Sequence, residues 1–344
     1  MSFLSHVVSS ILGPDRSAID KRKSTGSQRA PTEHDVYWAY RLLLDREPES
    51  PSAVTHHLGH PNRRALVQEL IRSKEFQVNN PLPGPLVGRF VEEEASRIET
   101  VATADQLEVM LARIATAWRA FGDTEPHYSV LTADAFRAKN IGANRETFYK
   151  SGFVDVNRPV AALARNGIPI STLHRALDYG CGVGRITVPL ATHFASVTGI
   201  DVSPKHIEYG RRWADENALD NVDYFVLSNL SQLDSFGGVD FIFTVIVLQH
   251  NPPPVIKITL EKLLTLLRPG GCAYFQVPTY IDGYAFRSAD YISSRSLRME
   301  MHAIPQQAVF QLVRACGCDP IELREDNSTG SSKMLSHTFL VQKR

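Results

Sequence analysis

The chain has 344 residues, of which 43% are hydrophobic and 22% are charged. Lysine and arginine together number 37, as do aspartate and glutamate, so no net positive field recruits nucleic acid and we expect no nucleic-acid partner. This composition predicts a soluble globular protein of more than one domain. The four cysteines lack zinc-ligand spacing, which predicts a reducing cytoplasm and no metal site.

The first 31 residues combine a short apolar helix with a polar stretch. Apolar side chains of residues 1–12 fall on one helical face, but this segment is too short to cross a bilayer and lacks the basic start of a signal peptide. We expect it to pack on the body of the protein. Weak contact with a membrane surface or a protein partner is the alternative. Residues 13–31 are polar and basic and predict a flexible linker.

Residues 32–79 predict a small helical unit. Thr32 can begin a helix that ends before Pro51, and Asn62 can begin another that reaches Phe76. The apolar stripe of the first helix comprises Val36, Tyr37, Tyr40, Leu43 and Leu44. The sequences of residues 40–48 and 70–76 resemble the DUF4214 family, a helical module that accompanies bacterial cell-surface and carbohydrate-modifying proteins. Both a docking role and a packing role are open for this unit.

Residues 80–125 predict a linker followed by a long helical region. Three prolines and two glycines fall within residues 79–88, which is typical of a linker. From Arg89 to Phe121 the chain is charged and amphipathic, with apolar side chains at helical spacing. We expect this helix to cover part of the following domain, with a helical partner interface as the alternative.

Residues 176–184 read Ala-Leu-Asp-Tyr-Gly-Cys-Gly-Val-Gly, the pattern of a buried strand that ends in a tight turn and opens a helix. Gly180, Gly182 and Gly184 permit positive φ and close approach of a ligand to the backbone. The third glycine of a dinucleotide fingerprint is replaced by Arg185, which disfavours a nicotinamide oxidoreductase. A tight turn without a ligand is the alternative.

This run resembles motif I of class I S-adenosylmethionine-dependent methyltransferases. The resemblance covers roughly residues 126–344 and implies an α/β fold: a Rossmann-like, doubly wound, mostly parallel seven-stranded sheet, preceded here by an N-terminal all-α accessory region. It implies S-adenosyl-L-methionine as the cofactor, with Arg185 paired to the methionine carboxylate. The cofactor-binding residues on this basis are Asp178, Gly180, Cys181, Gly182, Gly184, Arg185, Asp201, Val202, Asn229, Leu230, Tyr128, Phe148 and Val245.

Two positions downstream support this interpretation. Asp201 ends a second strand about twenty residues after the glycine loop, the spacing at which an acid reaches a ribose hydroxyl. Asn229 follows the third strand, where the family usually has an acid that accepts from adenine, and its side-chain oxygen can still accept one hydrogen bond. Upstream, Tyr128 and Phe148 would close over the cofactor by the resemblance. A hydrophobic cap without cofactor contact is the alternative for both aromatics.

The fourth strand, from residue 239, is apolar and leads to His250. A histidine at this end of the sheet can remove a proton if the acceptor is a hydroxyl, or it can simply cap the strand. Residues 279–303 mix aromatics with arginines, which predicts either a lid over the acceptor or a solvated loop. A helix at 306–315 and strands near 320–325 and 336–342 would complete the sheet.

The sequence thus predicts a methyltransferase that methylates an oxygen of a saccharide or related small metabolite. The alternative, from another class, is a binding or scaffolding protein. Such a protein would act through residues 1–121 and retain a cofactor pocket that no longer serves catalysis.

Overall fold

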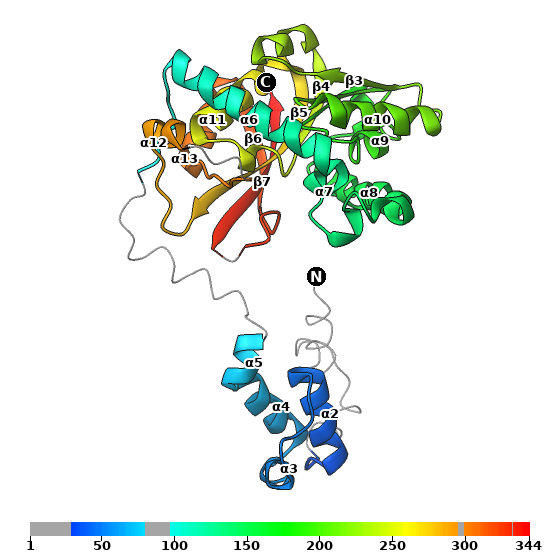
Figure 1. The fold of residues 1–344 in the computed structure, drawn as a ribbon, viewed down its shortest axis with the longest axis vertical. Helices are drawn as coiled ribbons and strands as arrows, with labels where there is room; N and C mark the ends of the chain where they lie inside the picture. Colours follow the sequence, from blue (N-terminus) through cyan, green and yellow to red (C-terminus); the bar gives the residue numbers. More distant parts are fainter. Residues whose placement is uncertain (1–28, 80–96, 295–298, 332) are drawn as a thin grey trace. The chain divides into compact units, whose positions relative to one another are not determined.

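The computed structural model describes residues 29–79, 97–294, 299–331 and 333–344. The chain divides into two compact units, residues 1–93 and 94–344 (Figure 1). The predicted helix at 1–12 lies outside the described residues, as do most of the linkers predicted at 13–31 and 79–88 and the first residues of the helical region predicted from Arg89. Within the described ranges, no helix has the length and apolarity that crossing a bilayer requires.

The N-terminal unit consists of helices α2 (Glu33–Leu44), α3 (Pro51–Leu58), α4 (Arg63–Arg72) and α5 (Lys74–Asn79). Thr32 and Asn62 cap α2 and α4 as expected, because each side-chain oxygen accepts from a backbone N–H three residues on. Tyr37 was wrongly placed in the apolar stripe, since it is exposed. Helix α3, which Ser50 caps, was not predicted. The helix predicted from Asn62 to Phe76 is two helices, α4 and α5, separated at the extended Ser73.

The C-terminal unit contains the sheet. Its strands are β1 (Arg175–Tyr179), β2 (Ser196–Asp201), β3 (Val222–Val226), β4 (Val239–Thr244), β5 (Leu267–Ile281), β6 (Cys318–Asp326) and β7 (Met334–Lys343). Among the described residues the strand order is β3-β2-β1-β4-β5-β7-β6, with β1 to β5 parallel and β7 antiparallel to both neighbours. The predicted mostly parallel, seven-stranded, doubly wound sheet is confirmed.

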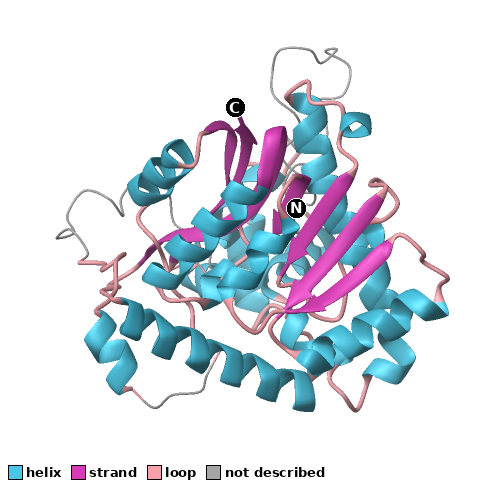
Figure 2. Ribbon diagram, turned by 90° about the horizontal axis from the view of Figure 1, so that it is seen from above, coloured by secondary structure: helices cyan, strands magenta, loops and turns pink. Residues whose placement is uncertain are grey.

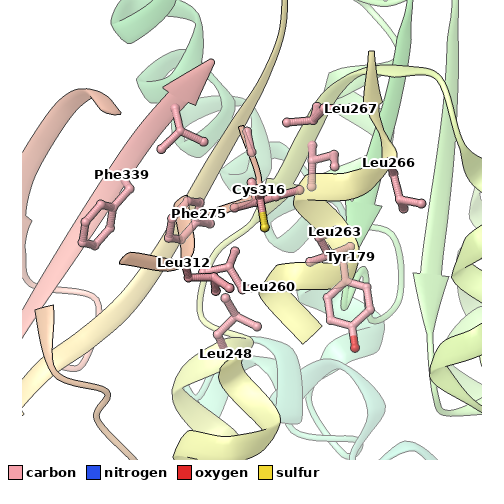
Figure 3. Packing of buried hydrophobic residues seen from close by; sticks show 14 of the residues in the cluster. Tyr179, Leu248, Leu260, Leu263, Leu266, Leu267, Phe275, Leu312, Cys316 and Phe339 are labelled. Carbon is pink, nitrogen blue, oxygen red and sulfur yellow. The ribbon is translucent and has the colours of Figure 1, made fainter. Parts of the chain in front are cut away.

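Helices connect and cover these strands (Figure 2). They are α6 (Ala104–Thr124), α7 (Pro126–Val130), α8 (Ile141–Arg165), α9 (Thr187–Leu190), α10 (Pro204–Glu216), α11 (Pro253–Leu266), α12 (Ser288–Ser293) and α13 (Gln306–Ala315). Alternate residues of one strand enter different cores. In β4, Ile242 packs with α11 and α13, while Phe241 and Phe243 pack in the core that includes α8. Figure 3 shows the first of these cores, in which Leu260 and Leu312 lie near Phe275.

The long helix before the sheet starts later than predicted. Thr103 and Gln106 form a capping box that begins α6, so the described residues 97–103 are not helical. Instead, Phe286 accepts a backbone hydrogen bond from Glu99 and donates one to Arg97, each at 3.1 Å. The 279–303 segment therefore holds the chain that leads into α6.

Candidate functional site

A cavity of about 720 Å³ lies beyond the carboxyl ends of β1, β2 and β4. The strand order reverses at β1, whose neighbours are β2 and β4, and ligands of open α/β sheets bind at such a switch point. The volume falls in the range of small-molecule sites. The predicted residues that line it are Asp178, Gly180, Cys181, Gly182, Arg185, Asp201, Val202, Asn229, Leu230 and Val245.

The glycine loop turns sharply between β1 and α9. Gly180 and Cys181 donate backbone hydrogen bonds to the Ile200 carbonyl, at 2.7 and 3.0 Å. Gly182 has φ +54°, and a Cβ there would lie 2.4 Å from a methyl group of Val130. Gly184 lies outside the cavity lining. It is required for packing, because a Cβ there would lie 2.1 Å from the Tyr224 hydroxyl oxygen.

Two aspartates flank this loop at the ends of neighbouring strands. Asp178 is buried and accepts a hydrogen bond from the Thr187 hydroxyl at 2.7 Å. Burial raises the pKa of Asp178 to about 7. Asp201 accepts from the backbone N–H of Gly182 at 3.0 Å and of Ser203 at 2.8 Å. These bonds fix the carboxylate at the cavity wall and leave it lone pairs for a ligand hydroxyl.

Arg185 forms part of the same wall but already has a partner. Its Nη1 donates to Asp155 at 2.7 Å and to the Ser151 hydroxyl at 3.2 Å, and both acceptors lie on α8. Its buried Nε has no acceptor among the described residues. The guanidinium is therefore anchored at one edge and retains an unsatisfied N–H.

Asn229 lines the cavity, but its side chain does not have the predicted role. It caps the short 3₁₀ helix Leu230–Phe236, because its Oδ1 accepts from the Gln232 backbone at 3.3 Å and from the Ser231 hydroxyl at 2.5 Å. The side-chain oxygen predicted to accept from adenine is thus occupied by its own turn.

Known proteins resemble this part of the chain. Residues 176–271 match the family described as methyltransferase domain. The chain is 41% identical over 70 residues to the 23S rRNA (uracil(1939)-C(5))-methyltransferase RlmD of Salmonella choleraesuis (strain SC-B67). It is 38% identical over 85 residues to the enzyme of the same name from Enterobacter sp. (strain 638). These matches cover 20% and 24% of this chain, and 16% and 20% of the relatives. The chain thus spans only about a fifth of the length of the curated relatives it matches.

The family match covers the glycine loop, the strands β1 to β4 and the first residues of β5. Solved structures with similarity to the chain include the magnesium protoporphyrin IX methyltransferase of Synechocystis PCC 6803 with bound SAH, at 17% identity and a TM-score of 0.49, covering 67% of this chain and all of that one. The N-methyltransferase NodS of Bradyrhizobium japonicum WM9, in complex with S-adenosyl-L-homocysteine, has 16% identity and a TM-score of 0.37, covering 50% of this chain and 78% of that one.

Two aromatics predicted to close over the cofactor lie outside the lining of the cavity. Phe148 is fully buried, and its ring centroid lies 5.1 Å from that of Phe136. Tyr128 stacks beneath the Arg137 guanidinium at 3.9 Å. Its chain neighbours Ser129 and Val130 line the cavity instead. This arrangement corrects the predicted lid, since both rings pack away from the site.

His250 also lies outside the cavity lining. It is 9% exposed, its Nδ1 lies 2.9 Å from the Glu300 carbonyl oxygen, and its Nε2 lies 3.2 Å from Gln249 Nε2. Burial lowers the pKa of His250. With both nitrogens engaged by protein groups, the predicted base role does not match the structure. The predicted strand cap does not match it either, because neither partner belongs to β4.

The outer wall of the cavity comes from α6. Its lining side chains are mostly apolar and include Leu107, Leu111, Ile114, Ala115 and Trp118. The sequence predicted that this helix covers the domain but did not assign it to the site, although its apolar periodicity was the signal. No described residue of the 279–303 segment lines the cavity. That segment packs Phe286 and Tyr291 against α6, which corrects the predicted acceptor lid.

Proposed function

We propose that the chain is an S-adenosylmethionine-dependent methyltransferase acting on a small molecule with an apolar part. The observation that carries the proposal is the placement of Asp178 and Asp201 on either side of the glycine loop, in one cavity at the switch point of the sheet. The methyltransferase family match covers this loop and both aspartates. An isolated tight turn would not require two carboxylates on the wall of a cavity.

The residues present suit the cofactor. The Asp201 carboxylate is held by two backbone N–H groups and would accept from the ribose hydroxyls. The ammonium group of the methionine part would pair with Asp178, and its carboxylate would satisfy the buried Arg185 Nε. Gly180 and Gly182 leave room for the methyl groups of Val247 and Val130, which line the same cavity.

When bound, S-adenosylmethionine supplies a methyl group already activated on a sulfonium. The contribution of this chain is therefore to bind, orient and exclude water. Asp178 and Asp201 fix the orientation of the polar parts, and the apolar face of α6 covers the cavity and keeps water out.

The lining of α6 favours an acceptor with an apolar group. Leu107, Leu111 and Trp118 offer a sugar hydroxyl no hydrogen-bond partner, which is unfavourable in a closed site. The polar lining residues of this helix are Glu108, Thr116 and Arg119, too few to satisfy a fully hydroxylated sugar face. Methylation of a saccharide oxygen, predicted from the resemblance of residues 32–79, is therefore proposed only for a sugar that carries an apolar substituent. We favour a small molecule over RNA because positive and negative side chains are equal in number.

Calorimetric titration with S-adenosylmethionine and S-adenosylhomocysteine tests the proposal, with NADH as the control ligand. We expect micromolar binding of the first two and none of NADH. The variant Asp201→Asn should weaken binding by about ten- to a hundredfold, because it removes a charged hydrogen-bond acceptor. The matched variant Asp223→Asn, at an exposed position of β3, should bind normally.

The outcomes discriminate between the proposed enzyme, an enzyme that acts on underivatised sugars, and a scaffolding protein. Binding followed by transfer of labelled methyl to hydroxylated aromatic or acyl compounds would support the whole proposal. Transfer to underivatised sugars alone would overturn the acceptor class. Absence of binding to either sulfur compound would favour a scaffolding protein.

A further inference from the structure

Three histidines and a glutamate converge in the N-terminal helical unit, outside the methyltransferase domain. His56 and His57 lie in the last turn of α3, His60 follows that helix, and Glu69 lies on α4. His56 Nε2 is 3.2 Å from Glu69 Oε1, and His60 Nε2 is 2.6 Å from Glu69 Oε2. Glu69 thus bridges two imidazoles, one with each oxygen.

His57 completes the cluster from the buried side. One ligand atom each of His56, His57 and Glu69 lie within 4.8 Å of one another. The Nε2 of His57 is 2.9 Å from the Tyr40 hydroxyl. Its Nδ1 is buried and has no hydrogen-bond partner among the described residues. A buried polar atom without a partner is costly, and a cation would provide one.

The rings of the three histidines are packed together. Ring centroids are 5.0 Å apart for His56 and His57, and 5.7 Å apart for His57 and His60, which are stacked. A hydrogen-bonded cluster without an ion explains the contacts of Glu69. It does not explain why Nδ1 of the buried His57 has no hydrogen-bond partner among the described residues.

We propose that His56, His57 and Glu69, whose ligand atoms converge, bind a divalent transition-metal ion of the zinc type, with His60 beside Glu69 as the fourth ligand. Three imidazole nitrogens and one carboxylate oxygen match the ligand preference and the fourfold coordination of structural zinc, whereas Ca²⁺ and Mg²⁺ prefer all-oxygen sites. The hydrogen bond between His57 Nε2 and Tyr40 supplies the outer partner that orients a metal-bound histidine.

The ion would join the end of α3 to the middle of α4. The apolar core of this unit is small; its buried members are Val36, Ala39, Tyr40, Leu43, Leu44, Val54, Leu66, Val67, Leu70 and Phe76. Small domains commonly gain stability from a structural metal. The proposal contradicts the expectation from the cysteine pattern that the chain has no metal site, because the ligands here are histidines.

Titration of the chelator-treated full-length chain with ZnCl₂ tests the site, and Co²⁺ absorption reports its geometry. We expect one zinc ion per chain and the intense visible bands of tetrahedral Co²⁺. Glu69→Gln and His56→Ala should each weaken zinc binding by at least about tenfold. Both residues are exposed, so the variants should remain folded, as circular dichroism would verify.

The matched control is His34→Ala, an exposed histidine on α2 of the same unit, which should bind zinc normally. Zinc should also slow amide hydrogen exchange in α3 and α4. Equal zinc affinity in all four proteins, or no zinc binding by the unmodified chain, would overturn the proposal. Titration with S-adenosylmethionine is a separate measurement, so failure here would leave the methyltransferase proposal untouched.

Discussion

The Nδ1 atom of His250 lies 2.9 Å from the carbonyl oxygen of Glu300. Because a carbonyl can only accept, Nδ1 carries the proton, and Nε2 accepts from the Gln249 amide at 3.2 Å. The Oε1 of Gln249 in turn accepts from Gln276 at 3.0 Å. The imidazole therefore connects the turn after β4 to the segment that packs on α6, and neither nitrogen is free to take a proton.

The variant His250→Ala should consequently lose stability. It removes two hydrogen bonds and leaves the Gln249 amide buried without an acceptor, so we expect the free energy of unfolding to fall by about 2–4 kcal/mol. Urea denaturation measures this loss, and calorimetry should show unchanged affinity for S-adenosylmethionine. Wild-type stability combined with lost methyl transfer would instead restore the catalytic role.

Local signals in the sequence predicted much of the fold because they act over a few residues. The glycine loop, the cap residues Thr32 and Asn62, and the helix at 306–315 all appear where expected. The start of α6 was also available, since Thr103 and Gln106 have capping-box spacing. Ile98 and Val101, which precede that box at helix-compatible spacing, concealed it.

What the sequence could not predict is how a polar side chain is used once it folds. Asn229 lies at the cavity, but its oxygen is used by its own helix cap. His250 follows β4 as expected, but residues about 50 positions later and its own neighbour engage both nitrogens. The cap at Asn229 is local and has capping-box spacing to Gln232, so the sequence did carry that signal. The Glu300 partner of His250 depends on a tertiary contact, which hydrophobic periodicity and motif spacing do not encode.

Cofactor binding should depend on pH through Asp178. Burial raises the pKa of this carboxyl to about 7, and only the ionised form can pair with the ammonium of the ligand. Affinity for S-adenosylmethionine should therefore be greatest near pH 8 and fall by about tenfold at pH 6, as protonation competes with binding. Calorimetry across this range measures the effect.

The variant Asp178→Asn provides the control for this pH profile. It cannot ionise, so it should bind weakly and with little dependence on pH. Asp201→Asn should bind weakly at every pH and still depend on pH, with the profile moved to lower pH because the Asp201 charge helps to raise the pKa of Asp178. A flat profile in the unmodified protein would contradict the proposed pairing of Asp178.

Alanine substitutions at Gly184 and Gly167 would separate the stability cost of backbone strain from the cost of side-chain crowding. Both have positive φ, +83° and +70°, but a Cβ at Gly167 meets no atom within 4 Å, whereas one at Gly184 lies 2.1 Å from the Tyr224 oxygen. Gly167→Ala should cost about 1 kcal/mol of folding free energy. Gly184→Ala should cost at least about 3 kcal/mol, because overpacking adds to the strain. Equal losses in thermal unfolding would mean that Tyr224 moves aside freely.

Arg113 fastens α6 to the segment that follows β5. Its Nη1 donates to the backbone carbonyls of Tyr291 at 2.5 Å and Ser294 at 2.9 Å, and its Nη2 pairs with Glu300 at 2.8 Å. The guanidinium also lies 4.1 Å from the centre of the Tyr291 ring. Since α6 forms the cavity wall, this one side chain controls how firmly the wall is held.

The variant Arg113→Lys should loosen that wall, because an ammonium cannot reproduce the forked donors of a guanidinium. We expect the stability of the C-terminal unit to fall by about 1–3 kcal/mol and amide hydrogen exchange in α6 to become faster. Arg137→Lys is the matched control, since Arg137 also stacks on a tyrosine but pairs with the exposed Asp134; its cost should stay below about 1 kcal/mol. If both variants leave exchange in α6 unchanged, the helix is held by its apolar face alone, and the contacts of Arg113 do not set the closure of the cavity.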